Sequence, residues 1–149
     1  MNKKLMFSSA TGEWATPQDF YDRLNKEFHF GLDAAATAEN AKCGSFFTEA
    51  DDGLTKPWTP FTTFVNPPYG RNKTGPWVHK AFEESQRGAL VVMLLAARTD
   101  TRWFHKWILG HAEIRFLPGR LKFGGCKDSA PFPSMVVIFL PKASRPSTN

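Results

Sequence analysis

The residues best suited to chemistry form one short run, Asn66-Pro67-Pro68-Tyr69, directly after the apolar residues Phe64 and Val65. Prolines fix the backbone and remove donors, so the carbonyls beside them are free to face a ligand instead of a neighbouring strand. Asparagine adds an acceptor and two donors, and tyrosine adds a flat aromatic face. The run therefore predicts a small hydrogen-bonding pocket with a stacking platform.

Such a pocket suits methyl transfer to an exocyclic amino nitrogen. The lone pair of adenine N6 is delocalised into the ring and is a poor nucleophile. The Asn66 side-chain oxygen and the Pro67 carbonyl would hold the N6 hydrogens and aim the nitrogen at the methyl group of S-adenosylmethionine. Tyr69 would stack on a base rotated out of the duplex. The amino group of cytosine N4 would suit the same pocket, so the choice of base stays open at this point.

Strands and helices must alternate to position this run. Short aliphatic or β-branched segments predict strands at 63–65, 90–96 and 135–140, with a weaker one at 28–33. Capped amphipathic segments predict helices at 17–28, with Thr16 as the cap, and at 77–87 and 101–109. The segment 119–133, rich in glycine and proline, predicts a hairpin or long loop. This alternation predicts an α/β domain with a mostly parallel sheet, which binds ligands at the carboxyl ends of its strands.

The composition is that of an ordinary globular protein. The chain has 149 residues, a formal net charge of +5 and 42% hydrophobic residues. These values predict one domain, over 13–141, between flexible ends at 1–12 and 142–149. The longest apolar run, 89–97, is too short to cross a membrane, and no signal-peptide pattern is present. We therefore expect a cytoplasmic protein.

Neither the cysteines nor the histidines predict a metal site. The two cysteines, Cys43 and Cys126, lack CxxC spacing, and neither follows a proline as the nucleophile of C5-methylating enzymes does. The four histidines show no paired ligand spacing. We expect no metal, and methyl transfer requires none.

The run at Asn66 is similar to the (D/N/S)PP(Y/F) motif of amino-methyltransferases that act on DNA. With several further segments, it resembles the phage and prophage DNA N-6-adenine-methyltransferase (Dam-like) family over residues 12–140. The further segments are 14–17, 32–36, 47–54, 97–105 and 119–125. The resemblance implies a minimal class-I (Rossmann-like) fold without a separate target-recognition domain. It also implies methylation of adenine N6 in DNA by a phage- or prophage-encoded protein in the cytoplasm of a bacterial host cell.

The resemblance also implies roles for single residues. Trp14, Thr16 and Pro17 resemble the segment that contacts the methionine end of S-adenosylmethionine, and Asp33 resembles the acid that holds its amino group. Asp51 and Asp52 resemble the acidic motif that reads the adenine amino group of S-adenosylmethionine, without a choice between the two. Since aspartate replaces Asn66 in many relatives, a carboxylate there is expected to keep much of the activity.

One segment departs from the pattern of DNA methyltransferases at large. Ala34-Ala35-Ala36 stands where they carry a glycine-rich FxGxG turn. This departure supports an alternative, a nucleic-acid-binding protein that keeps the fold and lacks catalysis.

Basic residues near the predicted strand ends are candidates for DNA contacts, with Phe132 as the second face of a base sandwich. The candidates are Arg71, Lys73, Arg98, Arg102, Arg120, Lys122 and Lys127. Any one of them alone is more simply a solvated surface charge, and Phe132 is equally suited to anchor a loop. As a set they predict a DNA footprint.

Overall fold

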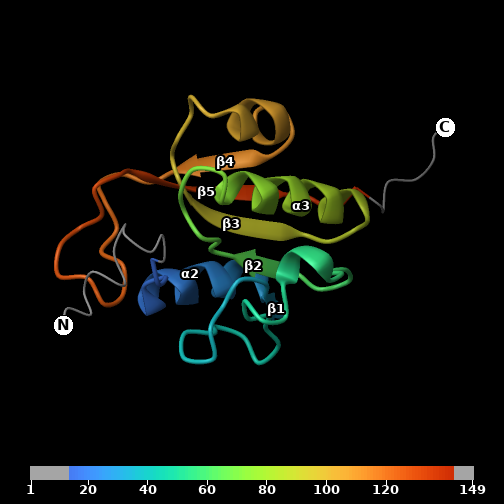
Figure 1. Ribbon diagram of the computed structural model, residues 1–149, viewed down its shortest axis with the longest axis horizontal. Helices are drawn as coiled ribbons and strands as arrows, with labels where there is room; N and C mark the ends of the chain where they lie inside the picture. Colours follow the sequence, from blue (N-terminus) through green and yellow to red (C-terminus); the bar gives the residue numbers. More distant parts are fainter. Residues whose placement is uncertain (1–13, 143–149) are drawn as a thin grey trace.

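A computed structural model describes residues 14–142, so the ends expected to be flexible lie outside it apart from Lys142. Five strands form one sheet in the order β1-β2-β3-β5-β4 (Figure 1). They are β1 (Leu32–Asp33), β2 (Thr63–Val65), β3 (Val91–Ala96), β4 (Glu113–Phe116) and β5 (Ser134–Phe139). The helices are α2 (Gln18–Phe28), α3 (Thr74–Gln86) and two short turns, η1 (Gly53–Thr55) and η2 (Phe104–Ile108).

Four of the five strands run in one direction. Strands β1, β2 and β3 are paired in parallel, and β5 is antiparallel to both β3 and β4. Strand β4 therefore points the same way as the first three. The predicted α/β class with a mostly parallel sheet is confirmed, and the carboxyl ends of β1 to β4 share one edge of the sheet.

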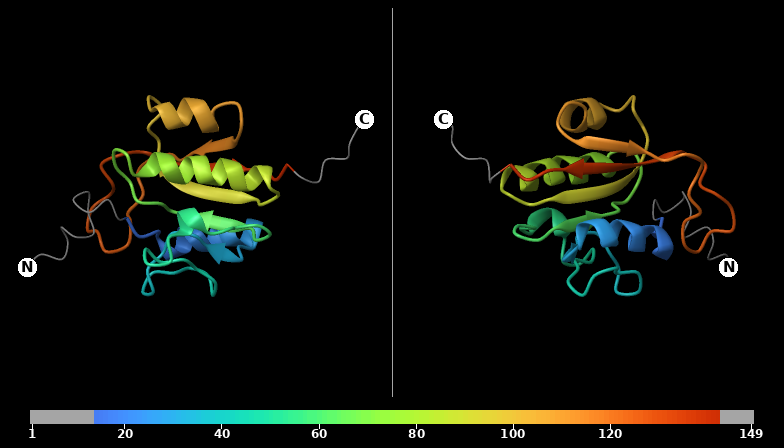
Figure 2. Two further views of the ribbon diagram at one scale, coloured as in Figure 1. Left: turned by 45° about the vertical axis from the view of Figure 1, so that its right-hand side comes forward. Right: turned by 180° about the vertical axis from the view of Figure 1, so that it is seen from behind.

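Both faces of the sheet are covered, which explains why β3 is apolar along its whole length. Val91, Met93 and Leu95 belong to the core under α3 and η2, whereas Val92 and Leu94 belong to the core under α2. Each fully buried side chain of this kind stabilises the fold by about 1.5–3 kcal/mol. The two views of Figure 2 place α3 and α2 on opposite faces of the sheet.

The helix α3 begins earlier than the predicted start at residue 77. Its first turn contains Gly75 and Pro76 after Thr74. A proline in the first helical turn removes no intrahelical hydrogen bond, since the N–H groups there have no partner in the helix. The loop after β2 is therefore short, and it holds the run at Asn66 directly against the start of α3.

Two other predicted elements are shorter than expected. The strand predicted at 28–33 is reduced to β1, because α2 continues through Phe28 and His29 then turns into the left-handed region with φ 56°. The helix predicted at 101–109 contains the π turn η2, which the Leu109 N–H closes by donating to the Phe104 carbonyl.

The sequence analysis missed strand β4. It is four residues long, lies at the edge of the sheet and exposes Glu113 and Phe116. Edge strands of this kind carry little apolar signal. A bidentate ion pair between Arg115 and Glu27, at 2.7–2.8 Å, joins β4 to the end of α2.

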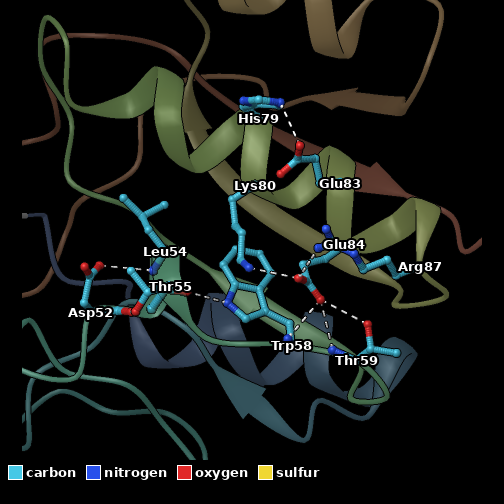
Figure 3. Close-up of polar contacts among 11 residues, drawn as sticks. Asp52, Leu54, Thr55, Trp58, Thr59, His79, Lys80, Glu83, Glu84 and Arg87 are labelled. Atoms are coloured by element: carbon cyan, nitrogen blue, oxygen red, sulfur yellow. Dashed lines mark hydrogen bonds and ion pairs between the residues drawn. The ribbon is translucent and has the colours of Figure 1, made fainter.

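The buried Glu84 of α3 joins this helix to the turn before β2 (Figure 3). One carboxylate oxygen accepts from the backbone N–H groups of Trp58 and Thr59, and the other accepts from Lys80 and Arg87 at 2.9 Å. Burial alone raises the pKa of Glu84, but these hydrogen bonds outweigh it and lower the pKa to about 2. The ionised carboxylate therefore holds the end of α3 against this turn.

Candidate active site

A cleft of about 830 Å³ lies at the carboxyl ends of β1 and β2. Parallel α/β sheets bind ligands at this edge. Its wall is formed by residues 14–16, 33–37, 39, 40, 42, 48, 49, 52, 53, 64, 66–68, 73, 77, 124 and 125. The cleft thus brings together segments that are far apart in the sequence.

The amide of Asn66 is anchored to the segment before α2. Its Nδ2 donates to the carbonyl oxygen of Trp14 and to Oγ1 of Thr16, the latter at 2.9 Å. Its Oδ1 is buried and has no hydrogen-bond partner among residues 14–142. A buried acceptor without a partner is costly, so this oxygen is suited to accept from a bound donor.

The two proline carbonyls after Asn66 differ. The Pro68 carbonyl accepts from Oγ1 of Thr74 at 3.0 Å. No hydrogen bond from residues 14–142 reaches the Pro67 carbonyl oxygen. The cleft wall therefore offers two acceptors next to each other in the chain, Asn66 Oδ1 and the Pro67 carbonyl.

Asp33, at the end of β1, carries a second unpaired acceptor. The residue is 3% exposed, its Oδ2 accepts from the Lys42 N–H at 3.0 Å, and its Oδ1 has no partner in the described chain. Burial raises the pKa of Asp33 to about 6, although the hydrogen bond from Lys42 and the nearby backbone N–H of Ala35 act in the opposite direction. This carboxylate is suited to a cationic ligand group.

The structure brings Asp52, and not Asp51, to the cleft. Asp52 has a φ of 57° and caps η1 by accepting from the Leu54 N–H. Asp51 is exposed, and its carboxylate accepts from the N–H and the hydroxyl of Thr48. The two hydrogen bonds from Thr48 lower the pKa of Asp51, and burial opposes this shift only slightly.

The alanine turn after β1 needs no glycine. None of Ala34, Ala35 and Ala36 has a positive φ. Ala34 donates to the Phe64 carbonyl, and Ala36 donates to the Phe47 carbonyl. The small residues therefore line the cleft in ordinary backbone conformations, and the departure from the glycine-rich pattern does not close it.

Gly53 is a site residue whose role the sequence analysis missed. A Cβ at this position would overlap the Ala34 carbonyl oxygen, and it would lie 3.2 Å from the ring of Trp77. The indole N–H of Trp58 donates to the Gly53 carbonyl at 2.9 Å. The backbone of Gly53 lies so close to the backbone of Ala34 that only glycine fits at this position. In the sequence, the Asp52-Gly53 pair was the only sign of this requirement.

Thr16 does not have the structural role predicted for it. The helix α2 begins at Gln18 after Pro17 and has no side-chain cap. The Thr16 hydroxyl accepts from Asn66 instead. Trp14 and Thr16 line the cleft, whereas Pro17 does not.

The two aromatic residues predicted to hold a base lie outside the cleft wall. Tyr69 is 7% exposed, and its hydroxyl donates to the Leu94 carbonyl at 2.8 Å. Its ring packs edge-on against Phe132 and Phe123, and Phe132 packs in turn against Trp14. The buried anchor, one of the two interpretations of Phe132, agrees with this placement.

The candidate DNA-contact residues follow the carboxyl ends of three strands. Arg71 and Lys73 follow β2, Arg98 and Arg102 follow β3, and three others occupy the loop 117–133 after β4. These three are Arg120, Lys122 and Lys127. All seven are exposed, and Lys73 also lines the cleft.

The loop 117–133 lies beside the start of α2 (Figure 1). Gly124 in this loop donates to the Ala15 carbonyl at 2.8 Å and lines the cleft together with Gly125. The basic residues and the cleft therefore share one edge of the sheet. The part of the chain that the structure describes has no helix long and apolar enough to span a membrane.

The chain is similar to known phage proteins along most of its length. A family model described as DNA N-6-adenine-methyltransferase (Dam) matches residues 6–148. The DNA N-6-adenine-methyltransferase of Haemophilus phage HP1 is 32% identical over 139 residues, which cover 87% of this chain and 79% of that protein. The DNA N-6-adenine-methyltransferase of Escherichia phage T1 is 32% identical over 110 residues, which cover 72% of this chain and 45% of that protein. The chain therefore belongs to the DNA N-6-adenine-methyltransferase (Dam) family.

Proposed function

We propose that the protein transfers the methyl group of S-adenosylmethionine to N6 of an adenine in DNA, with S-adenosylhomocysteine as the second product. The observation that carries the proposal is the pair of unpaired buried acceptors, Asp33 Oδ1 and Asn66 Oδ1, in the wall of one cleft. One suits a cationic amino group and the other suits the N–H of a neutral base. Family membership favours adenine over cytosine.

S-adenosylmethionine, when bound, supplies a methyl group on a positively charged sulfur. Asp33 would hold its amino group, and Asp52 would accept from its adenine amino group. Trp14 and Thr16 would line the methionine end, and the turn at Ala34–Ala36 would allow close approach of the backbone. These residues share one cleft of sufficient size, which supports the assignment.

Asn66 and Pro67 would hold the target nitrogen. Each carbonyl oxygen accepts one N6 hydrogen, so the lone pair of the nitrogen is drawn out of the ring plane and aimed along the line of transfer. The methylated nitrogen then loses one proton to water, because an amide or peptide carbonyl oxygen is too weakly basic to keep it.

DNA would lie across the basic edge of the sheet. The seven exposed basic residues that follow β2, β3 and β4 suit phosphate contacts, and such contacts position a duplex without reading its sequence. Stacking of the base on Tyr69 belongs to the same proposal and requires Phe132 to move, because the two rings are now 5.5 Å apart. We infer that the activity takes place in the cytoplasm of a bacterial host, an inference that the phage origin of the two relatives supports.

Product analysis tests the proposal. Unmethylated duplex DNA is incubated with the protein and methyl-labelled S-adenosylmethionine and then digested to nucleosides. We expect label in N6-methyl-2′-deoxyadenosine only, and none with a duplex built from guanine and cytosine alone. Label in the N4-methylated cytosine nucleoside would show that the protein methylates cytosine and not adenine. Retained DNA binding without any labelled nucleoside would establish the catalytically silent protein instead.

A further inference from the structure

The orientation of the Asn66 amide follows from the chemistry of its neighbours. The Trp14 carbonyl oxygen has no proton, so only the nitrogen of the amide can face it. The second Nδ2 hydrogen is taken by Oγ1 of Thr16 at 2.9 Å. Both hydrogens are thus engaged by one segment, and the amide oxygen alone is left for a ligand.

We propose that Thr16 is a positioning residue for the Asn66 amide, in addition to its place in the cleft wall. This inference rests on the proposed function, because it assigns Asn66 Oδ1 to the target amino group. The terminal torsion of asparagine has two broad, nearly equivalent wells. A flipped amide would turn its own N–H groups toward the N–H groups of the base, and the site would repel its substrate.

The burial of Thr16 supports this role. The residue is 6% exposed, and its hydroxyl does not cap α2. In the described part of the chain, its one hydrogen bond to another side chain is the bond from Asn66, 50 positions away. Thr16 therefore links the segment that borders the cofactor end of the cleft to the amide at the base end.

A double-mutant cycle separates this role from a direct role in cofactor binding. Thr16→Val keeps the shape of the side chain and removes the acceptor, and Thr16→Ser keeps the acceptor. At saturating cofactor we expect Thr16→Val to lower kcat about 10-fold, the usual effect of leaving one buried donor unpaired. Thr16→Ser is expected to stay within about threefold of the parent. In an Asn66→Ala background, Thr16→Val is expected to cause no further loss, since its target is gone.

Two results of the cycle would overturn the inference. The first is a full 10-fold loss from Thr16→Val in the Asn66→Ala background, which would place the effect on the cofactor or the fold. The second is equal damage from Thr16→Ser and Thr16→Val. A parent protein that forms no N6-methyladenine would instead overturn the proposed function itself.

A second measurement needs no variant at Thr16. The side-chain NH₂ signal of Asn66 is assigned by NMR through its loss in Asn66→Ala, and its exchange with solvent is followed. Anchoring at both hydrogens predicts exchange at least about 10-fold slower than for an exposed asparagine such as Asn40 in the same protein. If the Asn66 side-chain hydrogens exchanged with solvent as fast as those of the exposed asparagine, the anchoring would be contradicted. This result would hold even if Thr16→Val failed to fold.

Discussion

Asp33 and Asn66 each keep one buried side-chain oxygen that has no hydrogen-bond partner within residues 14–142, and both residues line the same cleft. Asp33 ends β1 and Asn66 follows β2, and these two strands are parallel neighbours, so the sheet fixes the relative position of the two residues. A fold seldom leaves buried acceptors unpaired, because each costs about 1–3 kcal/mol. Two such atoms in one cleft are explained by a pair of donors that arrive with the substrates.

The first prediction concerns cofactor affinity and pH. Burial raises the pKa of Asp33 from 3.8 to about 6, so below this pH the free protein holds the acid protonated and unable to pair with an ammonium group. The affinity for S-adenosylmethionine should therefore fall about 10-fold for each pH unit below 6 and reach a plateau above it. Isothermal titration between pH 5 and 8 measures this.

Asp33→Asn is the matched variant. It keeps the shape and one acceptor but removes the charge, so affinity at pH 8 should drop by about 2–3 kcal/mol and the pH dependence should disappear. A titration curve that is flat in the parent, or unchanged in the variant, would exclude Asp33 as the partner of the amino group.

The second prediction reverses an expectation from the sequence. Aspartate in many relatives suggests that Asn66→Asp keeps much of the activity, but an ionised carboxylate at this position would face the Trp14 carbonyl oxygen, which also only accepts. Only the protonated acid can donate to that carbonyl and still present an acceptor to the base. The variant should therefore lose about 100-fold in kcat at pH 8 and recover as the pH falls.

The ratio of kcat for Asn66→Asp to kcat for the parent, at saturating cofactor, is the quantity to measure. The cleft wall also contains other ionisable groups, whose effects are common to both proteins and largely cancel in this ratio. These groups are Asp33, Glu39, Lys42, Glu49, Asp52 and Lys73. A ratio near one at every pH would show that the Trp14 carbonyl does not favour asparagine over aspartate at position 66.

The sheet and its active edge were predictable because their signals are local. The apolar run of β3 predicts a buried strand, and the run Asn66-Pro67-Pro68-Tyr69 predicts a turn at the edge of the sheet, without knowledge of other contacts. Asp33 and Thr16 were found through their resemblance to family motifs. Their relation to Asn66 was not, since the bond from Asn66 to Thr16 joins residues 50 positions apart.

Other features depend on packing that a linear pattern does not carry. The role of Gly53 follows from its contact with the Ala34 carbonyl, and the burial of Tyr69 follows from its contacts with Phe123 and Phe132. Strand β4 was missed because a short edge strand exposes half of its side chains. For each of these features, the residues whose contacts determine it lie far away in the sequence.

The third prediction concerns stability. Glu84→Ala removes a buried carboxylate that accepts hydrogen bonds from four residues, so the free energy of unfolding should fall by about 3–5 kcal/mol in urea denaturation. Arg87→Ala is the control: its side chain is 61% exposed, and its loss should cost less than about 1 kcal/mol. Equal losses of unfolding free energy in both variants would show that the buried carboxylate contributes no more to stability than the exposed Arg87 side chain.

The same residue sets part of the acid sensitivity. The pKa of Glu84 is lowered from 4.5 to about 2 on folding, so its contribution is fully present above about pH 4.5 and is lost as the pH falls toward 2. The parent should therefore lose stability over this range more steeply than Glu84→Gln. Parallel curves for the two proteins would contradict this.

The fourth prediction concerns DNA binding. If the loop 117–133 contacts phosphates, replacing both Arg120 and Lys122 by alanine should make the slope of log affinity against log salt shallower by about one to two units. The control replaces Arg23 and Lys26, two exposed cations of α2, and should leave the slope unchanged. If the slope changed only in the control variant, the DNA-binding surface would lie on α2 and not on the loop 117–133.

The fifth prediction tests the central claim most directly, and its measurement is the turnover of Asn66→Ala on DNA at saturating S-adenosylmethionine. The variant removes one of the two acceptors for the target amino group and leaves the Pro67 carbonyl in place. We predict a loss of about 100- to 1,000-fold in kcat, with the dissociation constant of the cofactor within about twofold of the parent value. Turnover equal to that of the parent would contradict the assignment of Asn66 as the catalytic acceptor.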